Sequence, residues 1–381
     1  MSSRPEVIYL DHAATSWPKP PEVGDSIRRF MEGVAANAGR SGHAASLDSA
    51  RMVFEVRGRL AALLGVRDSE NLVFTRGTTE GLNLVLKGFL SEGDRVLVSP
   101  MEHNSAMRPL TRLTAERSLR LGVMPADGFG QVDVSAARVM AEGAPPRLVV
   151  VSHVSNVNGV IQDLAGIREA FPDSALLVDA AQSAGVLPVD IEATGIDFLC
   201  CSAHKGLLGP TGVGVCYLNP AHRVEPLMEG GTGSRSEDTR HPDFRPDRYE
   251  AGTLNLHGIA GLAGALDHVE SAGLLGGHKR RLTSVLLDGL SAMNGVGLHS
   301  PADGSALMVS FTVEGMACDA VARGLEAAGV LCRTGLQCAP SAHRHLGTFP
   351  AGTIRLSPGF GNSEAHSAAA LKGLQAVLAG R

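Results

Sequence analysis

The sequence has no long uninterrupted apolar run, although 44% of its 381 residues are hydrophobic. No apolar stretch approaches the roughly 18 consecutive residues that cross a bilayer as a helix. The first residues, 1–6, also lack the apolar segment of a secretory signal peptide. These absences argue against a membrane partner and favour a cytoplasmic protein.

Cysteine is scarce as well, with six residues and no Cys-x-x-Cys pair. So few cysteines in a chain of this length do not make a disulfide framework, which fits a reducing compartment. Cys200 and Cys201 lie in an apolar run and are expected in the core. The cluster of histidines most like a metal site is His343-Arg344-His345. It has no cysteine or carboxylate at ligand spacing, so we predict a solvated loop there and no metal site.

Charge of one sign is not concentrated anywhere in the chain. The formal net charge is -5 and no block of basic residues occurs. Nucleic acid is therefore not an expected partner, because binding to its phosphates requires clustered positive charge.

Short β-rich runs alternate with longer helical patterns over the first two-thirds of the chain. Strands are predicted at 7–10, 72–75, 95–99, 147–152, 175–179, 198–202 and 214–218, and helices at 46–64, 79–90, 106–117 and 164–170. Continuous apolar strands separated by helices are typical of a mostly parallel sheet covered on both faces. Ligands bind such α/β sheets at the carboxyl ends of the strands, where we expect Thr75, Ser99, Ser152, Asp179 and Ser202.

The composition changes at residues 229–253, a polar stretch with glycine and proline that is typical of a loop. Helices at 259–269 and 279–293 follow it. The remainder reads as a small α/β unit, with strands at 306–312 and 353–357 and helices at 317–328 and 363–379. A chain of this size is long enough for more than one domain.

Lys205 is the most informative single residue, because it follows an apolar strand and precedes a turn rich in glycine and proline. A second apolar run ends in Asp179. A lysine near an anion-binding turn, together with a carboxylate at a neighbouring strand end, is the arrangement that pyridoxal phosphate (PLP) chemistry requires. The lysine carries the cofactor, and the carboxylate keeps the pyridine ring protonated.

The residues around 75–81 join a strand to a helix and contain Thr78 and Thr79. The exposed N–H groups at a helix start form an anion site, which the threonine hydroxyls, Ser202 and His204 can extend toward a phosphate. Two further residues are expected at the cofactor ring. Gln182 is placed to reach its phenolic oxygen, and His103 to stack on its open face.

Cys338 differs from the other cysteines because its segment is polar, contains glycine and lacks the periodicity of a core element. Arg333 precedes it by five residues, and a nearby cation lowers the pKa of a thiol and raises its thiolate fraction. Cys338 is therefore the candidate nucleophile. Cys332, at the end of an apolar pair, is expected in the core.

Nine motifs in order resemble the class V aminotransferase-fold PLP enzymes, and within them the cysteine desulfurase and selenocysteine lyase group. They are YLDHAAT at 9–15, TRGTTE at 75–80, EHN at 102–104, HVSNVNG at 153–159, VDAAQ at 178–182, SAHK at 202–205, EAGT at 250–253, RTGLQC at 333–338 and GTIRLS at 352–357. The resemblance implies a type I PLP-dependent transferase fold. A large domain at 14–258, with a mostly parallel seven-stranded sheet, would bind PLP. Residues 1–13 and 259–381 would form a smaller α/β domain carrying the cysteine loop.

The resemblance also implies roles for particular residues. Lys205 would hold PLP and later move the α-proton, and Cys338 would take sulfur from the substrate. The expected cofactor-binding residues are Thr78, Thr79, His103, Asp179, Gln182, Ser202, His204 and Lys205, with Thr253 reaching across from the other subunit of a homodimer. The expected substrate-binding residues are Asn156, Arg333 and Arg355, because an arginine fork matches a carboxylate.

The implied reaction is removal of sulfur from L-cysteine, giving L-alanine and a persulfide on Cys338, with a sulfur-acceptor protein or a small thiol as the next carrier. The Arg-Thr-Gly-x-x-Cys form resembles group II desulfurases, which commonly have Gly-His-His-Cys. Here Leu336 and Gln337 replace both histidines, which removes acid/base partners for the sulfur. Selenocysteine lyase activity on L-selenocysteine uses the same site and stays open. So do another class V chemistry (aminotransferase, epimerase or C–S lyase) with Cys338 as a bystander, and a scaffold without catalysis.

Overall fold

The computed structural model describes residues 7–33, 35–39, 42–140 and 142–380. Its centre is a seven-stranded sheet in the order β2-β8-β7-β6-β5-β3-β4. Six of these strands run in one direction, and β8 runs in the opposite direction. The predicted mostly parallel sheet is thereby confirmed. The strands are β2 (Leu72–Thr75), β3 (Arg95–Val98), β4 (Arg120–Val123), β5 (Leu148–Ser152), β6 (Ala175–Asp179), β7 (Phe198–Ser202) and β8 (Gly214–Leu218).

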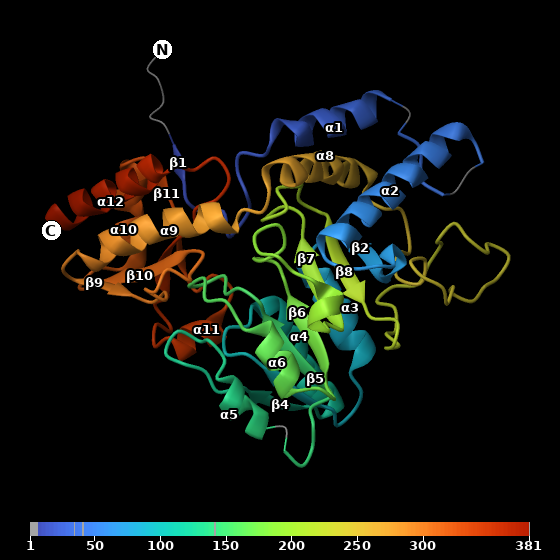
Figure 1. Ribbon diagram of the computed structural model, residues 1–381, viewed down its shortest axis with the longest axis horizontal. Coiled ribbons are helices and arrows are strands. Elements are labelled where there is room, and N and C mark those ends of the chain that lie inside the picture. Colours follow the sequence, from blue (N-terminus) through green and yellow to red (C-terminus); the bar gives the residue numbers. More distant parts are fainter. Residues whose placement is uncertain (1–6, 34, 40–41, 141, 381) are drawn as a thin grey trace.

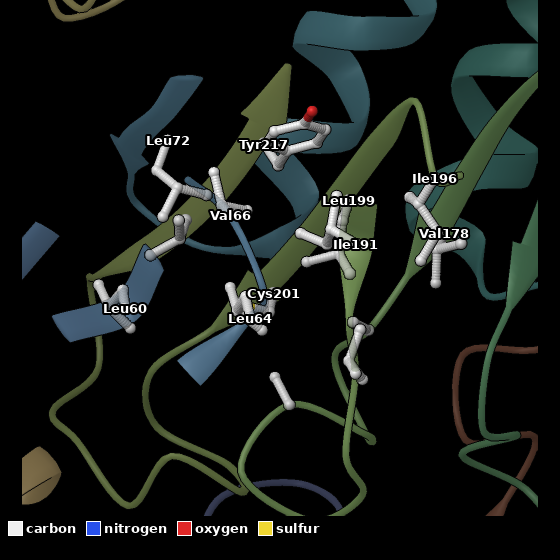
Figure 2. Close-up of a cluster of buried hydrophobic side chains, with 14 of the residues drawn as sticks. Leu60, Leu64, Val66, Leu72, Val178, Ile191, Ile196, Leu199, Cys201 and Tyr217 are labelled. Atoms are coloured by element: carbon white, nitrogen blue, oxygen red, sulfur yellow. The ribbon is translucent and has the colours of Figure 1, made fainter. Parts of the chain in front are cut away.

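Helices cover both faces of this sheet, as its buried central strands require. Successive side chains of a strand point to opposite faces, so Leu199 and Cys201 of β7 belong to one core and Phe198 and Cys200 to the other. Figure 2 shows part of the first of these cores, with Leu60 of a covering helix and Leu199 of β7 among its buried side chains. The helices of this part are α1 (Pro21–Glu32), α2 (Ala44–Leu63), α3 (Thr78–Phe89), α4 (Asn104–Arg117), α5 (Val134–Val139), α6 (Leu164–Ala170), α7 (Ile191–Thr194) and α8 (Leu256–Ala272), with the 3-10 turn η1 (Ser69–Asn71) before β2.

The C-terminal elements form a separate layered unit at the left of Figure 1. An antiparallel sheet has the order β12-β13-β10-β9, and a two-stranded parallel sheet pairs the N-terminal β1 with β11. The elements are β1 (Ile8–Tyr9), α9 (Gly276–Ser291), β9 (Val296–Leu298), β10 (Val309–Val313), α10 (Cys318–Ala327), β11 (Val330–Leu331), β12 (Arg333–Gly335), α11 (Pro340–His345), β13 (Thr353–Leu356) and α12 (Glu364–Ala379).

The proposed domain division after residue 258 falls inside α8. This helix packs against α1, beside it in Figure 1, and contributes Ile259 and Leu266 to the core of the large sheet. The division stays a proposal. Residues 1–6, which the sequence assigned to the small domain and read as lacking a signal segment, lie outside the described residues.

Two features of the chain bear on the remaining expectations. Residues 229–253 contain no helix or strand, in agreement with the predicted loop. Within the described parts of the chain, no helix is both long and apolar enough to span a bilayer.

Candidate active site

A cavity of about 260 Å³ lies where the carboxyl ends of the parallel strands face β12 and β13. The predicted residues that line it come from both parts of the chain: Thr78, Thr79, His103, Asn156, Asp179, Gln182, Ser202, His204, Lys205, Arg333, Cys338 and Arg355. Thr253 does not line this cavity. It is exposed and lines a separate hollow with Thr75 and Glu80.

The first region of the cavity is an anion cradle at the start of α3. The backbone N–H of Thr78 donates to Ser202 Oγ at 2.9 Å, and the two side-chain oxygens lie 2.7 Å apart. Gly77, with φ +154°, stands so close to Gly214 that a Cβ on Gly214 would come within 2.4 Å of the Gly77 Cα. The glycines let β8 approach the turn, which leaves hydroxyls and a helix N-terminus to meet a phosphate.

Asp179 supplies a buried carboxylate at the end of β6. Burial raises its pKa, whereas the N–H of Ala181, which donates to Asp179 Oδ1 at 2.9 Å, and the charge of Lys205 lower it. A protonated ring nitrogen beside this carboxylate would add a third stabilising partner for its charged form. Gln182 donates its amide to the carbonyl of Ala13 at 2.9 Å, so its orientation is fixed at the cavity wall.

His103 is the N-cap residue of α4 and projects from the end of β3. Burial, followed by the charge of Lys205, lowers its pKa to about 4, so the ring is neutral at pH 7. The N–H of Ser105 donates to His103 Nδ1 at 3.0 Å. The remaining proton of the neutral ring is therefore on Nε2.

Lys205 follows β7 in a tight turn, where Leu208 N–H donates to its carbonyl at 3.0 Å. Burial is the main cause that lowers the pKa of its ammonium, and the charge of Asp179 opposes this effect. Arg355 and Arg333 lower the pKa further. A larger share of neutral amine results, which favours nucleophilic and base chemistry.

Two arginines face the cavity from neighbouring strands, since Arg333 of β12 and Arg355 of β13 are direct cross-strand partners. Arg355 is 2% exposed, donates to the carbonyl of Asn156 at 2.7 Å and forms an ion pair with Asp11. Its Nε has no partner among the described residues. This paired cation is suited to a substrate carboxylate. Sequence reasoning gave Asp11 no role, although it lies within the YLDHAAT motif.

Cys338 is exposed and lies in the turn that follows β12. Its carbonyl accepts from Asn104 N–H at 2.8 Å. Asn156, expected to contact substrate, donates its side-chain amide to the carbonyl of Gln337 at 2.7 Å. Cys332 packs against the C-terminal core, and burial raises the pKa of its thiol to about 12, in agreement with a core role.

The expected solvated loop at His343 to His345 is wrong. These residues end α11, and His343 is fully buried. Its ring contacts Gln337 and Thr348, while His345 Nε2 donates to the carbonyl of Asp127. The burial of His343 was not visible in a segment whose local composition is polar.

Glu102 is a second residue that sequence reasoning left without a role. It is fully buried and accepts from Ser99 Oγ at 2.6 Å, Ser152 N at 2.7 Å and Ser152 Oγ at 3.0 Å. Burial raises its pKa to about 7. The carboxyl thus links the ends of β3 and β5, and Ser152 lines the cavity beside Asp179.

The residues present fit PLP. His204 Nδ1 is buried with no partner in the described part of the chain, and it stands next to Lys205 and the cradle at Thr78. An orphaned buried nitrogen calls for a partner that the protein itself does not supply. Phosphate-binding donors, a buried carboxylate and an amine of lowered pKa are thus gathered around one cavity.

Comparison with known proteins gives a consistent result. Residues 8–366 match the family described as Aminotransferase class-V. The chain is 36% identical over 361 residues to a probable cysteine desulfurase of Methanothermobacter thermautotrophicus, covering 92% of this chain and 89% of that protein. It is 35% identical over 347 residues to a cysteine desulfurase of Escherichia coli O127:H6, covering 87% and 84%. The apo structure of cysteine desulfurase from Thermococcus onnurineus NA1 has a TM-score of 0.92 at 33% identity, covering 98% of this chain and 95% of that chain.

Proposed function

The chain belongs to the class V aminotransferase family, and from this premise we propose that it is a PLP-dependent cysteine desulfurase whose persulfide forms on Cys338. The observation that carries the proposal is that the exposed Cys338 thiol lines the same cavity as the Lys205 amine and the paired arginines. L-Cysteine is the substrate and L-alanine the product.

PLP, when bound, supplies an electron sink that makes the Cα proton of an amino acid removable. The phosphate would be held by the hydroxyls of Thr78 and Ser202, by the start of α3 with Thr79, and by His204. Asp179 would pair with the pyridine nitrogen, and Gln182 would bind the phenolic oxygen. His103, a neutral imidazole that lines the same cavity, would contact the ring.

Arg355 binds the substrate carboxylate, and Asp11 holds its guanidinium in place through their ion pair. Arg333, opposite it on β12, adds a second positive charge. Asn156 contacts both neighbours, because its backbone carbonyl accepts from the Arg355 guanidinium and its side-chain amide donates to the Gln337 carbonyl. Together these contacts orient the amino acid so that its sulfur faces Cys338.

Lys205 moves the Cα proton with its Nζ. Its lowered pKa favours the neutral amine that can accept a proton at neutral pH. The Nε2–H of His103 is a donor at the cavity and can exchange a proton there.

Cys338 then attacks the substrate sulfur with its thiolate Sγ. A sulfur–sulfur bond forms and the substrate Cβ–S bond breaks, with its electron pair remaining on the carbon side. Cβ takes up one proton, Lys205 returns a proton to Cα, and the carbon skeleton leaves as alanine. An acceptor thiol later removes the outer sulfur of the persulfide.

Three finer features belong to the same proposal. The protein acts as a homodimer in which Thr253 of the second subunit contacts the phosphate; its exposure in this chain is consistent with that role. The sulfur passes to an acceptor protein or a small thiol. The location is the cytoplasm, in keeping with unpaired cysteines.

The test is alanine release from L-cysteine with dithiothreitol, with L-selenocysteine assayed in parallel. Cys338→Ala is compared with Cys318→Ala, which removes a half-buried thiol outside the cavity. We expect Cys338→Ala to lower kcat with L-cysteine by about 100-fold or more, and Cys318→Ala to leave it unchanged. Turnover of selenocysteine that survives Cys338→Ala, without alanine from cysteine in the wild type, would favour a selenocysteine lyase instead.

A further inference from the structure

We propose that Gln337 and His343 are positioning residues that hold the Cys338 thiol at a fixed place relative to Arg355. The inference rests on the proposed function and concerns the residues that organise its nucleophile. Both side chains are buried, Gln337 with 4% and His343 with 0% of its surface exposed, although Cys338 beside them is exposed.

The turn that carries the thiol has an uncommon backbone conformation. Gln337 has φ +41° and Cys338 has φ +58°, so two consecutive residues with side chains lie in the left-handed region. Residues other than glycine rarely adopt this region, and they stay there where the surrounding structure dictates it. The turn therefore needs contacts that hold it.

Two such contacts come from the large-sheet part and reach the turn's backbone. The amide of Asn156 donates to the Gln337 carbonyl at 2.7 Å, and Asn104 N–H donates to the Cys338 carbonyl at 2.8 Å. Ala339 and Ala342, just beyond the turn, also pack in a small apolar cluster with Met101. One side of the turn is thereby fixed to the start of α4, which His103 caps, and to the segment that follows β5.

The Gln337 side chain fixes the other side. Its Nε2 donates to the carbonyl of Thr353 at 3.0 Å, and its Oε1 contacts His343 Nε2 at 2.7 Å. Thr353 is the first residue of β13, and Arg355 follows two residues later on the same strand. The amide group of Gln337 therefore connects the turn that carries Cys338 to β13, the strand that carries Arg355.

His343 orients that amide. Because Gln337 Oε1 can only accept, His343 Nε2 carries the proton, and Nδ1 accepts from Thr348 Oγ1 at 2.8 Å. Burial lowers the pKa of His343 to about 4, so the ring keeps this neutral form at pH 7. The backbone of His343 is held in turn, since Thr348 N–H donates to its carbonyl at 2.9 Å.

This network has a direct chemical consequence. Attack on sulfur requires reacting atoms about 3 to 3.5 Å apart, and a displacement of about 1 Å can slow such a step about 100-fold. Substrate is held through Arg355 while the thiol is held through Gln337. A connection between the two sets the separation of the reacting sulfur atoms without movement of a long loop.

The test compares Gln337→Leu, which removes both side-chain hydrogen bonds at similar volume, with His343→Phe and His343→Gln. The glutamine at 343 can still donate to Gln337 Oε1, whereas phenylalanine cannot. Thr334→Val is the matched control, because its hydroxyl lies on the same β12 segment but donates to Asp319, outside the cavity. Each PLP-loaded variant is assayed for kcat, KM and the rate of Cys338 alkylation by iodoacetamide.

We expect Gln337→Leu and His343→Phe to lower kcat about 10- to 100-fold with KM within about threefold of wild type. The alkylation rate should change at least about threefold, since the thiol no longer has one fixed environment. His343→Gln should recover most of kcat, and Thr334→Val should match wild type in all three quantities.

A kcat within about twofold of wild type in His343→Phe would overturn the inference, as would equal losses in His343→Gln and His343→Phe. The two histidine variants keep the test decisive if Gln337→Leu does not fold. Either result leaves the proposed function intact as long as wild type releases alanine and Cys338→Ala does not. Failure of wild type itself would overturn the proposed function.

Discussion

The buried ion pair between Arg57 of α2 and Glu250 gives a stability prediction whose size follows from its contacts. Arg57 Nη1 and Nη2 donate to the two carboxylate oxygens at 2.7 and 2.9 Å, and each side chain is 6% exposed. Phe74 N–H also donates to Glu250 at 2.6 Å, and the guanidinium lies 4.7 Å from the Phe74 ring centre. The pair thus joins α2, β2 and the segment that leads to Thr253.

Replacing Arg57 by methionine keeps an unbranched side chain of similar length but leaves the Glu250 carboxylate buried with one N–H donor. Removal of one partner from a buried pair lowers the free energy of unfolding by about 3 to 5 kcal/mol. The control is Arg59→Met on the same helix. Arg59 makes the same two-pronged contact with Glu270, at 2.9 and 2.8 Å, but the side chains are 27% and 52% exposed. Solvent and salt screen that pair, so the expected loss is only about 0.2 to 1 kcal/mol.

Urea unfolding followed by circular dichroism, at pH 7 and a fixed PLP concentration, measures both losses from the shift in midpoint at constant slope. The double variant Arg57→Met with Glu250→Gln should recover more than half of the loss, because the unpaired charge is then absent. Equal losses for Arg57→Met and Arg59→Met would refute the argument that burial decides the strength of this pair. A double variant no more stable than the single one would show that packing on Phe74, not charge, was lost.

Two further predictions concern carboxylates near the cavity, the buried Glu102 and the partly exposed Asp11. Glu102 has a pKa raised from 4.5 to about 7 in the folded state, so the folded protein binds its proton more tightly than the unfolded chain, and its contribution to stability is lost as pH rises from about 4.5 through about 7. Glu102→Gln should therefore reduce the fall in unfolding free energy over that interval, and an unchanged pH profile in urea titrations would contradict this assignment. Asp11→Asn removes the charge that holds Arg355, and we expect KM for L-cysteine to rise about 10-fold with a smaller change in kcat, measured by steady-state alanine release. A fall in kcat at constant KM would instead place Asp11 in the chemical step.

The large sheet could be predicted because each of its central strands has a recognisable pattern in the local sequence. β5, β6, β7 and β8 are continuous apolar runs whose residues are all buried, and the polar residue that ends three of them, Ser152, Asp179 or Ser202, reaches the cavity. The edge strand β4 was missed because Arg120–Val123 is an exposed or half-buried segment with a charge and a glycine. α1 was missed for a related reason. Only Val23 and Ser26 of its twelve residues are buried, and its few apolar residues, although at helical spacing, form only a narrow stripe.

In the candidate site, too, some residues could be predicted from local sequence and others could not. Residues at strand ends, such as Asp179 and Lys205, could be placed because parallel topology alone brings strand ends together. Gln337 could not, because its partners Thr353 and His343 are set by how β12, β13 and α11 fold back on one another. From the sequence alone, glutamine at position 337 indicates the loss of a histidine that could act as an acid/base partner for the sulfur. In the folded chain the same amide is buried and makes hydrogen bonds to Thr353 and His343. Glutamine at position 337 therefore supplies no acid/base group but connects the Cys338 turn to the strand of Arg355. If that link sets the rate, activity in this chain depends on the distance from Cys338 to Arg355 rather than on a proton donor beside the thiol.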